Sequence, residues 1–132
     1  MSNFEKYEHW LDLCIDDLDT VKWLLDGKRL LYCGYFCHLI TEKALKAAVA
    51  KNTGEIPPKI HDLRKLAKLS GVFDKLSKAD ILFINDISSF QIEARYPEYK
   101  EKINQTLSEE YCTKLIQRTE DFLCWIKKQL EN

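Results

Sequence analysis

The chain has 132 residues, 45% of them hydrophobic and 31% charged, with a formal net charge of −1. This length fits a single domain, residues 1–132, and suffices for a hydrophobic core without disulfides or metals. The near-zero charge excludes an overall basic field for nucleic acid, although a local basic patch is compatible with it. The low content of glycine and proline, four and three residues, favours helices over a turn-rich β protein.

The N-terminus is polar, and no run of about 18 apolar residues occurs. We therefore expect no signal peptide and no membrane span, and we predict a cytoplasmic protein. The five cysteines lack a C-x-x-C pair, and we interpret most of them as buried reduced thiols. Cys33, Cys37 and His38 could form half of a metal site, but no second half is visible, so we predict no metal. No P-loop, Rossmann or zinc motif is present, and we predict no cofactor.

The first predicted helix runs from about Ser2 or Asn3 to Asp26, because its apolar residues recur at i, i+3, i+4 and i+7. Gly27 lies where a C-terminal cap is expected. Only a short turn then remains before the next apolar stretch. The first two helices should therefore be antiparallel neighbours.

The stretch from Leu30 to Lys51 is the second predicted helix, and its first half is apolar almost all the way round. Such a helix needs neighbours on every side, so we expect it at the centre of an all-helical bundle. Gly34 should cost about 1 kcal/mol relative to Ala in a helix interior. Close approach of another helix over the missing side chain would compensate for this cost.

The polar residues of this central stretch fall on one broad face: His38, Thr41, Glu42 and Lys46, with Lys43 at the margin. Glu42 and Lys46 form an i,i+4 pair in the favourable order. We interpret this face as the solvated stripe of the helix rather than as a catalytic site. His38 by itself is interpreted as a packed or hydrogen-bonded histidine rather than as a ligand.

A loop with paired prolines separates the second helix from a short basic third helix, and a cleft could open at this break. His61 or Asp62 should cap the third helix at its start, and Gly71 should end it. Ser77, with an acidic residue three positions on, begins the fourth helix. That helix should end by Tyr96, because Pro97 follows.

Thr106 or Ser108 should cap the last helix. The predicted fold is an all-α, up-and-down bundle of four long helices plus one short helix. The central helix and several aromatic residues together present more apolar surface than one small bundle should bury. We therefore predict a homodimer, in which a second copy covers part of this surface. The aromatics in question are Trp10, Trp23, Tyr35 and Phe36.

Several segments in this order resemble the HEPN domain, a family named for nucleotide binding in higher eukaryotes and prokaryotes. They are LLDG at 24–27, YFCHLITEKALKA at 35–47, PP at 57–58, HDL at 61–63 and ARYP at 94–97. The resemblance covers nearly the whole chain. It implies a dimerising helical bundle and frequent pairing with a minimal nucleotidyltransferase in two-gene toxin–antitoxin systems.

Many HEPN proteins are also metal-independent ribonucleases, with an Arg followed after four to six residues by a His. None of Arg29, Arg64, Arg95 and Arg118 is followed by a His at that spacing. The usual nuclease pair therefore cannot be transferred to this chain, and the sequence argues against an enzyme.

A different set of residues suits an anionic ligand. A helix N-terminus with basic side chains favours phosphate, Arg can bind it in bidentate fashion, and Tyr or His can stack on a base. Lys59 lies just before this basic helix. A purely structural alternative makes His61 and Asp62 a cap, pairs Arg95 with a carboxylate and packs Tyr96 under the loop. The candidate ligand-binding residues are Lys43, Lys46, His61, Asp62, Arg64, Arg95 and Tyr96.

Three functions follow as hypotheses. The first is a dimeric HEPN binding module for nucleotide or RNA phosphate, or for a nucleotidyltransferase partner. The second is a divergent metal-independent ribonuclease, with His61 as general acid or base and Arg95 stabilising the phosphate. The third is a structural dimer without a ligand.

Overall fold

The computed structural model describes residues 6–93 and 107–131, and every regular element in these ranges is a helix. The predicted all-α fold is confirmed, and the expected start of the first helix at Ser2 or Asn3 lies outside the described residues. The helices are α1 Tyr7–Asp26, α2 Leu30–Thr53, α3 Leu63–Ser70, the 3-10 helix η1 Phe73–Lys75, α4 Lys78–Glu93 and α6 Glu109–Leu130.

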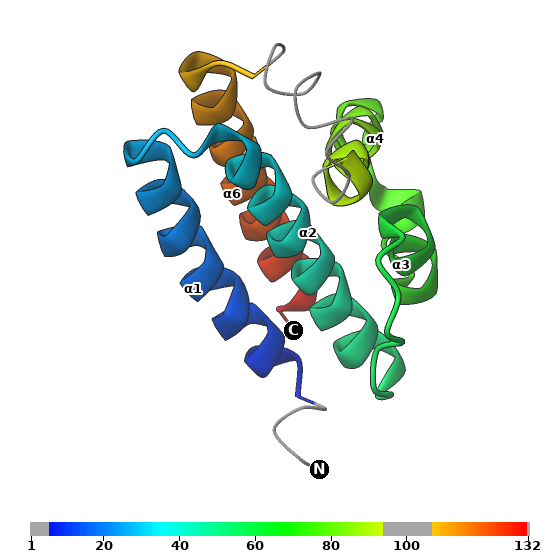
Figure 1. Cartoon of the computed structure of the whole chain (residues 1–132). Helices are drawn as coiled ribbons and strands as arrows, with labels where there is room; N and C mark the ends of the chain where they lie inside the picture. The colour runs from blue at the N-terminus through cyan, green and yellow to red at the C-terminus, as the bar shows by residue number, and fades with distance from the viewer. Residues whose placement is uncertain (1–5, 94–106, 132) are drawn as a thin grey trace.

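Helix α2 is the centre of the molecule, as its all-round apolar surface predicts. It packs against α1, α3, α4 and α6, and 15 of its 24 residues are buried. In Figure 1, α1, α2 and α6 lie side by side, while α3 and α4 cover the other side of α2. Helix α4 crosses α2 and is seen nearly end-on in this view. A helix enclosed in this way buries its polar side chains together with its apolar ones.

Gly34 marks the closest approach of α4 to α2. A Cβ atom at this position would lie 2.9 Å from Cδ1 and Cγ of Phe90, far inside van der Waals contact. The Phe90 ring therefore occupies the space that the glycine leaves open. This contact confirms that a neighbouring helix compensates for the glycine in the interior of α2.

The predicted caps are found at four helix ends. Asp62 accepts a hydrogen bond from the Lys65 amide at 3.0 Å, and Gly71 ends α3 with φ +83°. Ser77 and Asp80 exchange side-chain hydrogen bonds with each other's amides at 3.1 and 3.0 Å. At the last helix, the Ser108 hydroxyl accepts from the Tyr111 amide, whereas Thr106 lies outside the described residues.

The end of α1 is a variation on the expected cap. Gly27 occupies the C-cap position with φ −83°, and the residue with positive φ is Lys28 at +59°. The Arg29 amide then donates to the Leu24 carbonyl at 2.9 Å, so α2 follows directly. This compact turn makes α1 and α2 the antiparallel neighbours that the sequence predicts.

The aromatic residues are better covered than we expected. Trp10 and Phe36 pack against the core of the same chain, whereas Trp23 is 73% exposed.

All five cysteines are free thiols, and Cys124 is exposed while the other four are buried. None of the described helices is long and apolar enough to cross a membrane.

Candidate functional site

The polar face of α2 is not a solvated stripe, and this interpretation was wrong. His38 and Thr41 are each 1% exposed, Glu42 is 4% exposed and Lys46 is 7% exposed. The reason is that α1, α3 and α4 cover α2 on the sides where these residues lie. Buried polar groups of this kind need partners inside the protein.

Glu42 makes two such contacts, one with each carboxylate oxygen. One carboxylate oxygen, Oε2, accepts a hydrogen bond from Lys46 Nζ at 3.0 Å. The other, Oε1, lies 2.9 Å from Nδ1 of His61, which reaches α2 from the loop before α3. Lys46 Nζ also lies 5.7 Å from the centre of the Trp10 ring. We call Glu42, Lys46, His61 and His38 the polar cluster.

His38 is the member of this cluster whose hydrogen bonding is incomplete. Its Nδ1 lies 3.8 Å from Oε1 of Glu42, which is too long for a hydrogen bond. Within the described residues this buried atom has no hydrogen-bond partner. Burial lowers the pKa of His38 to about 4, although the Glu42 carboxylate acts in the opposite direction. The imidazole is therefore neutral at physiological pH.

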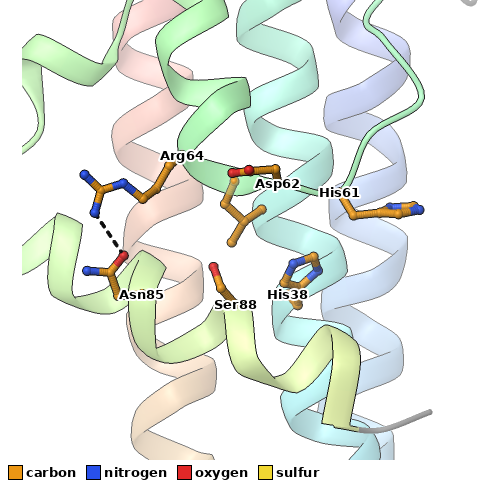
Figure 2. A pocket seen from close by; sticks show the side chains of 7 residues that line it. His38, His61, Asp62, Arg64, Asn85 and Ser88 are labelled. Atoms are coloured by element: carbon orange, nitrogen blue, oxygen red, sulfur yellow. Dashed lines mark hydrogen bonds between the residues drawn. The ribbon is translucent and has the colours of Figure 1, made fainter. Parts of the chain in front are cut away.

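A pocket of about 420 Å³ opens between α2, the start of α3 and α4, next to the polar cluster. This size falls in the range of small-molecule sites. Figure 2 shows Arg64 and Asn85 facing each other on one side, with Ser88 and His38 on the other. The lining residues are His38, His61, Asp62, Leu63, Arg64, Asn85 and Ser88.

Arg64 lines this pocket, and the neighbours of its guanidinium do not neutralise its positive charge. Its guanidinium donates to Oδ1 of Asn85 at 3.4 Å and lies 5.6 Å from the centre of the Phe73 ring. Both of these partners are uncharged, and no carboxylate pairs with Arg64 among the described residues. An arginine without an acidic partner at a pocket is a ready site for an anion.

The structure brings together some of the predicted site residues and separates others. His61, Asp62 and Arg64 line the pocket, and Lys46 joins them through Glu42. Asp62 also caps α3, so the structural alternative for it is confirmed. Lys43 turns to the opposite side, where its Nζ pairs with Asp17 of α1 at 2.5 Å.

Of the other residues considered, the structure describes Lys59 alone. Lys59 is exposed and is absent from the pocket lining. Arg95 and Tyr96 lie outside the described residues. The described residues contain no group of three His, Cys, Asp or Glu side chains suited to a metal ion.

The sequence interpretation missed four site residues: His38, Glu42, Asn85 and Ser88. A signal for the first two was present. Polar side chains in a helix that needs neighbours on every side must be buried, so His38 and Glu42 had to find partners. Asn85 and Ser88 carry no such signal, because polar residues on an amphipathic helix usually face solvent.

The fold and site together define a helical bundle domain with a polar cluster in its central helix and an adjoining ligand-sized pocket. The family model of the HEPN domain matches residues 7–129, and the chain belongs to this family. At the family level this supports a module of nucleotide-binding or ribonuclease type. No curated protein and no solved structure shows significant similarity to the chain.

Proposed function

We propose that the chain is a HEPN binding module that recognises the phosphate of a nucleotide or of RNA in the pocket between α2, α3 and α4. The observation that carries this proposal is Arg64, a cation at a pocket of about 420 Å³ whose neighbours are an amide and an aromatic ring. The Asn85 side chain beside Arg64 and the Ser88 side chain across the pocket add neutral hydrogen-bonding groups to the lining.

Calorimetric titration with nucleoside monophosphates tests this proposal. Arg64→Gln should weaken binding at least tenfold, because a charge-assisted hydrogen bond to phosphate is lost. The matched control is Lys65→Gln, which removes a neighbouring exposed cation of α3 that does not line the pocket. Equal losses in both variants, or no binding by the wild-type chain, would contradict the proposal.

A ribonuclease is the second candidate, and the hydrogen bond between Glu42 and His61 favours it. A carboxylate at Nδ1 orients an imidazole and leaves Nε2 to move a proton. His61 is half exposed, with 51% of its side chain accessible, and its ring points away from Arg64 and Ser88, so the reacting phosphate would lie on this outer side of the loop. Arg95 would stabilise charge on the phosphate in this scheme.

RNA cleavage in EDTA separates the two candidates. Cleavage that is lost in both His61→Ala and Arg95→Ala would establish a metal-independent ribonuclease. Binding of RNA without cleavage would support the binding module and contradict the ribonuclease. Cleavage that both variants retain would indicate a contaminant or another site.

The proposal also includes a homodimer and a protein partner. HEPN domains often form dimers and bind nucleic acids, which supports a homodimer for this chain. A minimal nucleotidyltransferase encoded beside it, as in toxin–antitoxin pairs, is the partner that the family suggests. Co-purification of the chain with such a neighbour would support that pairing, and failure of the two purified proteins to associate would contradict it.

A further inference from the structure

Two buried thiols meet where the last helix packs on the central one. Cys33 of α2 and Cys112 of α6 are both fully buried, and the Cys33 thiol donates a hydrogen bond to the sulfur of Cys112. The other contacts of the two sulfurs are long: 3.9 Å from Cys33 to the Val21 carbonyl oxygen and 3.8 Å from Cys112 to the Leu30 carbonyl oxygen. Thiols are weak donors, so these main-chain contacts hold the pair only loosely.

Both cysteines occupy the same position in their helices. Each is the fourth residue, and its amide donates to the carbonyl of the residue before the helix, Arg29 at 3.1 Å for Cys33 and Ser108 at 2.9 Å for Cys112. In Figure 1, α2 and α6 both begin at the upper end of the bundle. Helix ends open locally more easily than helix centres, so a small oxidant can reach sulfurs that the closed fold buries.

The surroundings favour a thiolate on Cys112 over one on Cys33. The hydrogen bond from Cys33 lowers the pKa of Cys112 and outweighs the effect of burial. The same hydrogen bond and burial both raise the pKa of Cys33. The thiolate is the form that attacks an oxidant, whereas a neutral thiol reacts slowly. Cys112 is therefore the better nucleophile of the two.

The other buried cysteines are placed less favourably for this chemistry. Cys37 lies one turn further along α2, where its thiol contacts Thr119. The Cys14 thiol donates to the Ile40 carbonyl at 3.4 Å. Burial raises the pKa of both Cys14 and Cys37 to about 12, so neither forms a thiolate at neutral pH.

We propose that Cys33 and Cys112 form a disulfide within the chain when it meets a peroxide. The Cys112 thiolate attacks one oxygen of hydrogen peroxide, the O–O bond breaks, and a sulfenic acid forms while hydroxide leaves. The Cys33 sulfur then attacks the sulfur of the sulfenic acid and releases its oxygen as water. The two thiols together lose two electrons and two protons, and one peroxide becomes two waters.

The test is oxidation of the folded full chain with hydrogen peroxide. The chain is then unfolded in N-ethylmaleimide and digested without reductant, and the peptides are identified by mass spectrometry. The number of alkylated thiols should fall from five to three, and a linked pair of peptides should carry Cys33 and Cys112. Treatment with a thiol reductant should restore all five thiols.

Variants separate the two roles. Cys33→Ala should abolish the linkage and leave a sulfenic acid on Cys112, which dimedone traps. Cys112→Ala should abolish the linkage and leave Cys33 reduced. The matched control is Cys37→Ala, which removes the next thiol on the same helix and should keep the linkage. Cys124→Ala removes the exposed thiol and should keep it as well.

Several results would overturn the proposal, and the wild-type chain alone can give them. One is a disulfide that joins Cys112 to Cys37 or to Cys124. Another is oxidation of Cys124 while Cys33 and Cys112 stay reduced. A third is a linkage between Cys33 and Cys112 that forms only after the chain has been unfolded in urea.

Discussion

At the residue scale, the polar cluster is the feature that departs most from an ordinary helical bundle. Glu42 is enclosed by Lys46 on one oxygen and by His61 on the other. His38 lies beside them with Nδ1 unpaired among the described residues. Because Glu42 is buried, the loss of Lys46 or His61 would leave one of its carboxylate oxygens without a partner.

We predict that acid destabilises the fold through His38. Its pKa is about 4 in the folded chain, against the ordinary histidine value of 6.5, so between these values the unfolded chain binds more protons. The free energy of unfolding should therefore be fully retained above about pH 6.5 and fall toward pH 4, by roughly 3 kcal/mol. Urea unfolding at pH 7, 5.5 and 4.5 measures this slope.

The variant His38→Gln should flatten the slope in this pH window, whatever it does to stability at pH 7. His9→Gln is the matched control for the loss of one imidazole, since His9 lies on α1 outside the polar cluster. An unchanged slope in His38→Gln would show that other groups cause the acid sensitivity.

Lys46→Met should destabilise the fold by about 3 kcal/mol or more, because it leaves the buried Glu42 carboxylate without its cation. Chemical denaturation at neutral pH measures the loss. The control Lys43→Met should cost less, since the Lys43–Asp17 pair is more accessible to solvent. The double variant Glu42→Leu with Lys46→Met should recover part of the stability, and its failure to do so would argue against an uncompensated charge as the cause.

At the element scale, α2 imposes the arrangement of the other helices. Its alanines at 44, 47, 48 and 50 are all buried and permit close packing. Its one glycine receives the Phe90 ring of α4. The pocket forms because α4 crosses α2 near this contact. The crossing places Asn85 and Ser88 of α4 in the same pocket lining as His38 and His61 of the polar cluster.

Gly34→Ala should therefore lower the melting temperature, although alanine is the better helix former. The added methyl group would meet Phe90 at 2.9 Å, and overpacking of this kind costs roughly 1–3 kcal/mol. Gly27→Ala is the matched control, because a Cβ there meets nothing closer than 3.7 Å and φ is −83°. A Gly34→Ala chain as stable as the wild type would mean that α4 shifts freely on α2.

The helices and their caps were predictable because they depend on local pattern. Asp62, Ser77 and Ser108 stand just before apolar periodic segments, and each caps the helix expected of it. The site was not predictable to the same degree. The contact of His61 with Glu42 joins residues 19 positions apart, and no local pattern encodes the crossing of α4 that adds Asn85 and Ser88.

At the scale of the whole molecule, one chain already covers its central helix, so a dimer is not needed to bury α2. Helix α2 and Trp10 are covered within the chain, whereas Trp23 remains 73% exposed at the end of α1. The proposed dimer must therefore be supported by surface residues such as Trp23 and by the family, rather than by an uncovered core.

We expect light scattering at micromolar concentration to give the mass of two chains. Trp23→Lys should shift the equilibrium toward the monomer if this side chain lies in the contact between the copies. Lys28→Ala, an exposed change in the turn that follows α1, is the control. A monomer in the wild-type sample would rule out the dimer at this concentration.

The central claim is that the pocket between α2, α3 and α4 binds a nucleotide through Arg64. The most direct measurement is a titration of the isotope-labelled chain with a ribonucleoside monophosphate, followed by nuclear magnetic resonance of the amide groups. The largest shift changes should fall at Arg64, Asn85 and Ser88, and Arg64→Gln should abolish them. Saturable changes centred elsewhere, for example around Trp23, or none at millimolar ligand, would contradict the claim.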